Sequence, residues 1–357
     1  MDRTRYDRQI KLKGFGKHGQ KLLQEARVLV VGAGGLGVPV CLYLNAMGVG
    51  TLGIADGDVV ETSNLHRQPA YGTADVGKLK IEVLSDRLQA QNPHTRVQKH
   101  PVFLMPSNVL EILGEYDLVV DATDRIPTRY LLDDACMIRR IPWIYGALHG
   151  FEGQLSVFNY QEGPTYRCLF PQIPKPGEIP DCNQLGTLGV LPGIIGTLQA
   201  LEAVKVICGL GEVLSGRLLL FNALDQESRK MRFPKDPAQG VREIRDDAHY
   251  HAMFCETGGA ISVGDYLERI KSGKAHLLVD VREKEEFNDF HLPDSLNIPL
   301  LELPKRINEL EGSAEVYLIC KSGSRSAQAY RTLEGQLKGT TLKWILGGVQ
   351  DFQAQPS

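Results

Sequence analysis

A short apolar run that ends in closely spaced glycines constrains the fold of this chain more than any other feature. The run 28–31 is Val-Leu-Val-Val, the glycines stand at 32, 34, 35 and 37, and apolar residues then recur at helical spacing as far as Met47. This order predicts a buried strand, a tight turn and a helix. Such a turn presents backbone amides and the positive end of a helix dipole, so the sequence predicts a phosphate site at Gly34 and Gly35.

Segments with strand and helix patterns alternate through the first two-thirds of the chain. Alternation of this kind is typical of the α/β class. We therefore predict a doubly wound, mostly parallel Rossmann-like sheet. The strand patterns cover 51–55, 118–122, 143–145, 154–160 and 217–222, and the helical patterns cover 78–90 and 129–139.

A change of composition separates this region from a second α/β region. Between 234 and 259 the periodicity fades and charges, prolines and glycines accumulate, which indicates an interdomain linker. Beyond it, strand patterns at 277–281 and 316–319 alternate with helical patterns at 263–271 and 326–337. The sequence thus predicts a first domain at 1–237, a linker at 238–259 and a smaller α/β domain at 260–357.

The overall composition argues against several classes of function. A net charge of -3 provides no general basic surface for nucleic acid. The apolar stretch 188–210 carries Glu202 and Lys205, and residues 1–20 contain no continuous apolar run, so we predict neither a membrane span nor a secretory signal. The cysteines are odd in number and irregularly spaced, so they are expected to be free thiols. We expect a cytoplasmic protein with no nucleic-acid or membrane partner.

An acidic residue follows the glycine turn at the distance expected for a nucleotide site. Asp56 ends the second predicted strand, about 20 residues beyond the glycines, where a carboxylate can bind a ribose hydroxyl. A glycine turn and an acid serve NAD as well as ATP. On these two features alone, a dehydrogenase and an adenylating enzyme both remain open.

A polar cluster downstream favours chemistry on phosphates. Ser63-Asn64-Leu65-His66-Arg67-Gln68 is followed by Lys80, and such cations stabilise the charge on a departing pyrophosphate. Asp124 follows the strand pattern 118–122, and Mg²⁺ is often held by one or two carboxylates together with phosphates. The alternatives are that Asp124 caps the next helix and that Arg67 and Lys80 are ordinary surface charges.

Several motifs in this order resemble the ubiquitin-activating-enzyme-like adenylyltransferases of molybdopterin and thiamine biosynthesis. They are Arg5-Tyr6-Asp7-Arg8-Gln9-Ile10, the glycine turn, the cluster 63–68 and Ala122-Thr123-Asp124, and the resemblance covers about 5–237. It implies that ATP and Mg²⁺ bind here, and it implies a homodimer in which Arg8 reaches the phosphates of the partner subunit. The residues that it assigns to ATP or its metal are Gly35, Asp56, Ser63, Asn64, Arg67, Lys80 and Asp124.

Two departures from that family bear on the chemistry. The family usually has two Cys-x-x-Cys pairs that bind a structural zinc through four thiolates. Here the first pair is reduced to Thr165-Tyr166-Arg167-Cys168, and the second is missing after Lys235-Asp236-Pro237, so no structural zinc is expected. Arg125 stands where the family commonly has asparagine. Arg125 remains a candidate nucleotide contact, with its role open.

One cysteine of the first domain is a candidate for covalent chemistry. Cys182 follows the proline-rich stretch 171–181 and lies in a segment that resembles the family's mobile crossover loop. That position permits attack on the activated glycine, and the alternative is a thiol that packs beneath the loop. Four further cysteines lie in apolar or linker contexts and are expected to have no chemical role; they are Cys41, Cys136, Cys208 and Cys255.

The second domain carries a short loop that starts at a cysteine and ends at an arginine. Cys320-Lys321-Ser322-Gly323-Ser324-Arg325 follows a strand pattern and opens a helical one, so loop amides and a helix dipole converge on the Cys320 sulfur. With Asp280-Val281-Arg282-Glu283 and His291-Leu292-Pro293 upstream, the segment 260–352 resembles a single-domain rhodanese. The alternatives are a phosphatase, whose loop is one residue longer, and an inactive rhodanese. Phe352 replaces the family's usual tryptophan.

Together the two resemblances predict an adenylyltransferase and sulfurtransferase that acts on a ubiquitin-like sulfur-carrier protein. Arg8, Arg67 and Lys80 would assist adenylation of the carrier's terminal glycine. Cys320, with Arg325 beside it, would then transfer sulfur from a persulfide donor such as a cysteine desulfurase or from thiosulfate. Cys182 or an external thiol would release the thiocarboxylate.

Two other functions and several pathways remain open at this stage. The first alternative is a non-catalytic protein that only docks carriers, and the second is an NAD-dependent enzyme with an accessory rhodanese. The carrier could serve the biosynthesis of molybdopterin, thiamine, cysteine, thiolated tRNA or a specialised metabolite.

Overall fold

The computed structural model describes residues 3–171, 186–240, 243–245, 250, 259–271, 273, 275–321, 323–337, 339–349 and 352. The chain divides into two compact units, of which the first ends at Tyr250 and the second holds the described residues from Gly259 onward. The division falls inside the predicted linker. The exact domain limits at 237 and 260 stay predictions.

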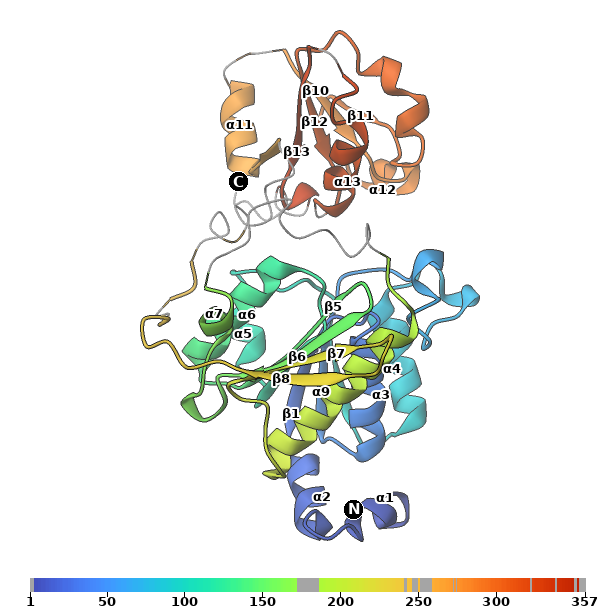
Figure 1. The fold of residues 1–357 in the computed structure, drawn as a ribbon. Coiled ribbons are helices and arrows are strands. Elements are labelled where there is room, and N and C mark those ends of the chain that lie inside the picture. Colours follow the sequence, from blue (N-terminus) through green and yellow to red (C-terminus); the bar gives the residue numbers. More distant parts are fainter. Residues whose placement is uncertain are drawn as a thin grey trace. The chain divides into compact units, whose positions relative to one another are not determined.

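The first unit is built on one eight-stranded sheet in the order β3-β2-β1-β4-β5-β6-β7-β8 (Figure 1). Strands β3, β2, β1, β4 and β5 pair parallel, and β6, β7 and β8 continue the sheet antiparallel. The mostly parallel, doubly wound sheet is thereby confirmed. Its strands are β1 (Arg27–Val31), β2 (Thr51–Ala55), β3 (Arg96–His100), β4 (Leu118–Asp121), β5 (Trp143–His149), β6 (Glu152–Phe158), β7 (Arg217–Asn222) and β8 (Ser228–Arg232).

Two strands of this sheet were not expected from the sequence. β3 and β8 lie at the two edges of the sheet, and every residue of β8 is exposed. Their sequences, Arg-Val-Gln-Lys-His and Ser-Arg-Lys-Met-Arg, lack the apolar run that marks a buried strand. Charged side chains are common on edge strands because they discourage pairing with other chains.

Helices cover both faces of the sheet in the first unit (Figure 1). Helix α3 follows the glycine turn, and α9 packs against α3, β5 and β6, so these elements enclose a large part of the apolar core. The helices are α1 (Arg3–Ile10), α2 (Gly16–Glu25), α3 (Gly37–Met47), α4 (Lys80–Gln91), α5 (Val109–Leu113), α6 (Ile126–Arg139), α7 (Tyr166–Leu169) and α9 (Val190–Cys208), with short 3-10 turns at η1 (Thr62–Asn64), η2 (Thr73–Asp75) and η3 (Tyr160–Glu162).

Helix α9 is long and apolar enough to cross a membrane, judged by length and composition alone, with a mean hydropathy of 1.5 over its apolar window. Half of that window is buried, and the helix lies against the sheet and α3. The core helix of a globular domain meets the same criteria of length and hydropathy. The contacts of α9 are those of a core helix, as its sequence predicted.

The second unit is a five-stranded parallel sheet in the order β11-β10-β12-β13-β9, with helices packed on it. This confirms the smaller α/β domain. Helix α13 ends at Leu333 rather than at the expected 337, shortly before Gly335 takes a left-handed φ of 75° that a helix cannot continue. The elements are β9 (Ala260–Ile261), α11 (Val263–Lys271), β10 (Leu277–Asp280), α12 (Lys284–Asp289), β11 (Ser295–Asn297), η4 (Leu303–Lys305), η5 (Ile307–Glu309), β12 (Glu315–Ile319), α13 (Ser324–Leu333) and β13 (Thr341–Ile345).

Candidate functional site

The glycine turn joins the end of β1 to the start of α3 in a space that admits no side chain. Gly32 has a left-handed φ of 100°, and a Cβ on it would lie 2.7 Å from the carbonyl oxygen of Ala122. A Cβ on Gly37 would lie 1.8 Å from the carbonyl oxygen of Gly32. Glycine is therefore required at both positions, and the turn sits directly against the end of β4.

Asp56 ties this turn to the end of β2. Its carboxylate accepts the backbone amide of Ala33 at 2.6 Å and that of Asp58 at 2.7 Å. Burial raises the pKa of Asp56, while the nearby Lys80 ammonium acts in the opposite direction. Each carboxylate oxygen still has lone-pair capacity for a ribose hydroxyl. Lys80 is buried and pairs with the exposed Asp58 at 3.1 Å, so the ammonium is held beside this carboxylate group.

The predicted polar cluster lies against the glycine turn. A guanidinium nitrogen of Arg67 donates to the carbonyl oxygen of Ser63 at 2.9 Å, and the Arg67 carbonyl lies 3.3 Å from where a Cβ on Gly35 would be. Asn64 and Gln68 are buried, and neither side-chain oxygen accepts a hydrogen bond from a residue that the structure describes. Buried oxygens without a donor are uncommon, so these two are candidates to bind a ligand.

Asp124 is exposed at the end of β4 and forms no hydrogen bond or ion pair with any residue that the structure describes. Arg125, not Asp124, is the N-cap of α6, and it makes no side-chain capping bond. The buried carboxylate of this segment is Asp121, which accepts the amide and the hydroxyl of Thr123 at 3.0 and 2.6 Å. These bonds fix the turn that carries Asp124, whose charge also attracts the buried Arg129 guanidinium.

A metal at this edge would depend on the nucleotide for most of its ligands. The described residues contain no group of three or more His, Cys, Asp or Glu side chains that could hold a metal ion. An exposed carboxylate such as Asp124 suits Mg²⁺, which often takes one or two carboxylates and completes its shell with phosphates and water. The residues present therefore fit a shared Mg²⁺ site rather than a protein cage.

Arg125 and Phe103 meet across the carboxyl edge of the sheet, a contact that the sequence did not indicate. The guanidinium carbon of Arg125 lies 4.7 Å from the centroid of the Phe103 ring. A Cβ on Gly57 would lie 2.9 Å from that ring, so Phe103 packs on the backbone next to Asp56. The two side chains form a flat wall beside the carboxylate expected to bind ribose.

Two other side chains that the sequence did not single out fix the backbone around the site. The side-chain amide of Gln199 on α9 donates to the carbonyl oxygen of Asp121 at 2.6 Å. The hydroxyl of Tyr71 donates to the carbonyl oxygen of Ala33 at 2.7 Å. Gln199 and Asp121 are separated by 78 residues. A local sequence pattern does not predict a contact between residues so far apart in the chain.

Arg8 is the one nucleotide-site candidate in the described part of the chain that lies at the far end of α3. Its neighbour Gln9 donates to the carbonyl oxygen of Met47, the last residue of α3, at 2.9 Å. The glycine turn lies at the opposite end, before the first residue of α3 (Figure 1). A helix of 11 residues is about 16 Å long. Arg8 is exposed and lies apart from the glycine turn of its own chain.

Of the other cysteines singled out from the sequence, three lie in described parts of the first unit and two do not. Cys182 and Cys255 lie outside the described residues. Burial raises the pKa of Cys41 and Cys136, and it raises the pKa of Cys208 to about 11. A raised pKa keeps these three thiols mostly protonated at neutral pH, and that they have no chemical role stays an expectation.

The loop that begins at Cys320 forms a small cup at the end of β12. Cys320 is buried, its sulfur accepts the amide of Gly323 at 3.2 Å, and the hydroxyl of Ser326 lies 3.6 Å away. Gly323 needs a left-handed φ of 92° for this turn. A Cβ on Gly348 would lie 2.1 Å from the Cys320 carbonyl oxygen, so the neighbouring loop also needs glycine. Amide donors directed at a sulfur stabilise a thiolate or a persulfide anion.

Arg325 is turned toward a carboxylate that the sequence analysis did not identify. Its two terminal nitrogens donate to the two oxygens of Glu286 on α12 at 2.6 and 2.8 Å. The hydrogen bond from Arg325 lowers the pKa of Glu286. The raised pKa of Arg325 has attraction to the Cys320 side chain among its causes, after the bond to Glu286, so the guanidinium lies between the cup and the carboxylate at its rim.

The upstream motifs of the second unit frame the cup. Asp280 and Arg282 form a buried ion pair at 2.7 Å, and Arg282 also donates to the carbonyl oxygen of Phe290 at 2.6 Å, which holds the end of α12. His291 is exposed and stacks on Phe287 with ring centroids 4.2 Å apart. Phe352 lies 5.9 Å from the ring of Tyr266, within the smaller apolar cluster of the unit.

Comparison with known proteins places both units in described families. Residues 6–241 match the model of the ThiF family, and residues 262–355 match that of the rhodanese-like domain. The chain is 38% identical to the "Adenylyltransferase and sulfurtransferase MOCS3" of Caenorhabditis briggsae, over 98% of this chain and 94% of that protein. It is 49% identical to the "Sulfur carrier protein adenylyltransferase" of Thermus thermophilus, over 70% of this chain and 96% of that protein.

Among solved structures, a likeness in fold covers the first part of the chain. The crystal structure of Escherichia coli MccB with MccA-N7isoASN matches with a TM-score of 0.59 at 20% identity, over 68% of this chain and 75% of that one. At this identity the match speaks for the fold alone.

Proposed function

This chain belongs to the ThiF family and carries a C-terminal rhodanese-like domain, and from that premise we propose that it adenylates the C-terminal glycine of a ubiquitin-like sulfur-carrier protein and then converts it to a thiocarboxylate. The observation that carries the proposal is the presence of both sites in one chain. A phosphate-binding turn with its polar cluster lies in the first unit, and a cysteine cup lies in the second. A relative that matches almost end to end carries both activities in its name.

In the first step the carrier's terminal carboxylate attacks the α-phosphorus of ATP, forms an acyl-adenylate and expels pyrophosphate. Negative charge grows on the phosphate oxygens as the bond to pyrophosphate breaks. Arg67 and Lys80 stabilise that charge, and the amides of the turn at Gly35 face the phosphates. Lys80 is already held at Asp58, so little reorganisation is needed when the nucleotide binds.

Asp124 is the residue that would hold Mg²⁺, shared with the phosphates of ATP. The ion would add positive charge at the oxygens of the leaving pyrophosphate. Asp56 would accept ribose hydroxyls, and Ser63, Asn64 and Gln68 would complete the polar lining with their hydroxyl and amide groups.

Arg125 is assigned here to the adenine base rather than to the phosphates. The wall formed by Phe103 and Arg125 stands next to Asp56, the ribose side of the site, because Gly57 separates the ring from that carboxylate. An aromatic ring and a planar guanidinium are suitable stacking surfaces for a purine. This gives Arg125 a role that asparagine at the same position could not fill by stacking.

In the second step a persulfide on Cys320 displaces AMP from the acyl-adenylate. The terminal sulfur of the persulfide bonds to the acyl carbon, and the carbon–oxygen bond to AMP breaks, which leaves an acyl disulfide between carrier and Cys320. A thiolate from Cys182 or from an external thiol then attacks the Cys320 sulfur and releases the thiocarboxylate. This leaves a disulfide on Cys320, which an external thiol must reduce before the next turnover.

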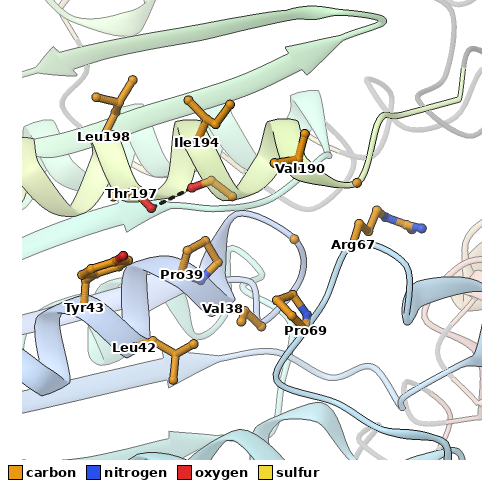
Figure 2. Close-up of a pocket in the computed structure, with 13 residues that line it drawn as sticks. Val38, Pro39, Leu42, Tyr43, Arg67, Pro69, Val190, Ile194, Thr197 and Leu198 are labelled. Carbon is orange, nitrogen blue, oxygen red and sulfur yellow. Dashed lines mark hydrogen bonds between the residues drawn. The ribbon is translucent and has the colours of Figure 1, made fainter. Parts of the chain in front are cut away.

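A homodimer would supply the missing arginine of the first site. Because Arg8 lies at the far end of α3 in its own chain, it can serve this site only from a second copy. The surface for that copy is an apolar groove between α3 and α9, where Tyr43 is 52% and Val190 61% exposed. Figure 2 shows Val38, Leu42 and Tyr43 along one side, Val190, Ile194 and Leu198 along the other, and Arg67 at its end.

Exposed apolar side chains on two helices suit the isologous contact of a symmetric dimer. Sedimentation of the Val190→Asp variant tests this assignment. We expect a monomer that has lost pyrophosphate exchange and kept the sulfurtransferase reaction with thiosulfate.

Carrier-dependent exchange of pyrophosphate into ATP tests the proposed function. A ubiquitin-like carrier that ends in Gly-Gly should support exchange, and the same carrier without its last glycine should not. A non-catalytic docking protein would bind the carrier and give no exchange, and an NAD-dependent enzyme would bind NAD instead. The sulfur donor, the pathway served by the carrier and the cytoplasmic location stay predictions.

A further inference from the structure

A buried arginine at the start of helix α6 lies beside the candidate nucleotide site and has no role in the steps above. Arg129 is 8% exposed and stands in the first turn of the helix that follows Asp124 and Arg125. Arginine is rarely buried unless its charge is paired. The groups around the guanidinium therefore indicate what this side chain does.

The guanidinium holds the end of β4 at two points. Its Nη2 donates to the carbonyl oxygen of Thr123 at 3.0 Å, and its Nε lies 3.3 Å from Oδ2 of Asp121. The Nε and the Oδ2 have no hydrogen-bond partner among the described residues, so the second contact is an ion pair without a directed hydrogen bond. The Thr123 carbonyl belongs to the peptide group that joins this turn to Asp124.

The guanidinium also packs on β5. Its central carbon lies 5.2 Å from the centroid of the Tyr145 ring, and Tyr145 is itself buried. Burial lowers the pKa of Arg129, but attraction to the surrounding groups, Asp121 and Asp124 among them, outweighs that effect and raises the pKa. The side chain therefore stays charged, and the ring and the end of β4 restrain its conformation.

Other bonds hold the preceding residues of the same strand end. The Gln199 side chain donates to the carbonyl oxygen of Asp121 at 2.6 Å, and the amide of Ala122 donates to the carbonyl oxygen of Val31 at 2.8 Å. These two bonds fix Asp121 and Ala122 against α9 and β1. Arg129 extends the support to Thr123, the residue before Asp124.

We infer that Arg129 is a positioning residue that orients Asp124 toward the metal bound with ATP. The inference rests on the metal site of the proposed function, because the orientation of Asp124 matters only if its carboxylate binds Mg²⁺. That carboxylate is the one protein ligand assigned to the ion, so a turn without restraint would weaken metal binding directly. The Asp121 carboxylate offsets part of the guanidinium charge, so a cation can still bind at Asp124.

The loss of Arg129 should affect the metal more than the nucleotide. Replacing a residue that holds a metal ligand in place typically lowers metal affinity about 10–100-fold. The nucleotide itself is assigned to other groups, namely the amides of the glycine turn, Asp56, Arg67 and Lys80. The defect should therefore appear in the part of ATP binding that depends on Mg²⁺ and spare the part that does not.

The test measures these two parts separately. A non-hydrolysable ATP analogue is titrated by calorimetry into the full-length protein, once with Mg²⁺ and once with a chelator. In the wild type, Mg²⁺ should tighten binding of the analogue. Arg129→Met should bind the analogue as the wild type does in chelator and should lose most of the gain from Mg²⁺. The Mg²⁺ concentration that half-saturates pyrophosphate exchange should rise about 10–100-fold, and saturating Mg²⁺ should largely restore the rate.

Three further variants complete the series. Arg129→Lys keeps a cation beside Asp121 and so guards against a loss of folding. Its ammonium lacks the fixed fork of a guanidinium, so its half-saturating Mg²⁺ concentration should lie between those of the wild type and Arg129→Met. Arg139 is an exposed arginine of the same helix that also donates to a backbone carbonyl, that of Leu110, and Arg139→Met should behave as wild type. Asp124→Ala gives the effect of removing the ligand itself.

An unchanged half-saturating Mg²⁺ concentration in both Arg129 variants overturns the positioning role. Equal losses of affinity with and without Mg²⁺ overturn it as well, because they indicate that Arg129 supports the nucleotide pocket as a whole. A gain from Mg²⁺ that survives in Asp124→Ala also overturns it, because the metal then binds elsewhere. If the wild-type protein supports no carrier-dependent exchange, the proposed function fails instead, and the calorimetric comparison still decides the role of Arg129.

Discussion

The two sites of this protein differ in the sequence separation of the residues that form them. In the first unit, Asp56, Arg67 and Asp124 come from the ends of different strands and from a connecting segment, and the sheet order brings them to one edge. In the second unit, the sulfur of Cys320 and its amide donor at Gly323 stand three residues apart. The first site is a product of tertiary structure, and the second is largely a product of one loop.

The two sites also differ in how deeply their carboxylates are buried and in the direction of the pKa shifts. The first site buries carboxylates that position backbone, and burial raises the pKa of Asp56 and Asp121. The second keeps Glu286 in a half-buried ion pair whose hydrogen bond lowers its pKa. A site assembled from distant elements needs buried polar groups to hold its backbone, whereas a local loop needs only one charged pair at its rim.

The largest expected effect is the complete loss of sulfur transfer in Cys320→Ala. Adenylation should continue, because the first unit has its own site, and acyl-adenylate should accumulate on the carrier. Mass spectrometry of the carrier after one turnover checks this, and Cys208→Ala is the control. In Cys182→Ala we expect a covalent carrier adduct on Cys320 instead. Thiocarboxylate formed at the normal rate by Cys320→Ala with a persulfide donor would show that the two sites do not act in sequence.

Removing one charged group of the first site should nearly abolish adenylation. Asp124→Ala and Arg67→Ala are each expected to lower carrier-dependent pyrophosphate exchange about 10²–10³-fold, the usual loss when one group that stabilises developing charge is removed. Sulfur transfer from thiosulfate should stay normal in both. Asp86→Ala, an exposed carboxylate on α4, is the matched control. Exchange near the wild-type rate in both variants would mean that the nucleotide binds elsewhere.

The two units should respond to pH in opposite directions. Burial raises the pKa of Asp133 to about 7 in the folded first unit, so folding favours its protonated form. The unfolding free energy of this unit should then fall as the pH rises from about 4 to about 7, by up to about 1.4 kcal/mol for each unit of pKa difference. The lowered pKa of Glu286 stabilises the second unit above pH 4.5, and this contribution is lost as the pH falls through the folded value.

Calorimetry of the full-length chain between pH 4 and 8 measures both trends. Asp133→Asn should reduce the downward slope of the first transition, to which the raised pKa values of Asp56 and Asp121 also contribute, and Glu286→Gln should weaken the acid sensitivity of the second. Slopes that both variants leave unchanged would show that other groups dominate the pH dependence.

A smaller effect is expected at the rim of the sulfur cup. Glu286→Gln removes the charge that matches Arg325, so the rim gains net positive charge and should attract thiosulfate more strongly. We expect the KM for thiosulfate to fall about threefold at low ionic strength and the difference to shrink in salt. Glu285→Gln, an exposed neighbour on α12, is the control. A higher KM would instead mean that Glu286 is needed to hold Arg325 in position.

The smallest effect is expected from metal removal. The purified protein should contain no stoichiometric zinc, because Cys168 alone remains of four expected thiolates and its sulfur is hydrogen-bonded to two backbone amides. Metal analysis and the Tm of the first unit with and without a chelator check this. One zinc per chain that survives chelation would contradict this prediction.

The sequence by itself predicted the elements whose signals are local. An apolar run followed by glycines marked β1 and the start of α3, and β2, β7 and α11 were predicted with their observed limits. The loop at Cys320 could be identified because a strand end, a cysteine and a helix start follow one another directly. The mixed polar edge strands β3 and β8 carried no such signal.

Only the tertiary structure decided which distant side chains contact one another. Phe103 and Arg125 stand 22 residues apart, Glu286 and Arg325 stand 39 apart, and Asp134 and Tyr250 stand 116 apart. Periodicity reports whether a residue faces the core of its own element, and it contains no information about which distant element packs there. Contacts such as these arise when strand order and helix packing bring separate segments to one place. For that reason the partners of Asp134 and Arg325 could not be predicted from the sequence alone.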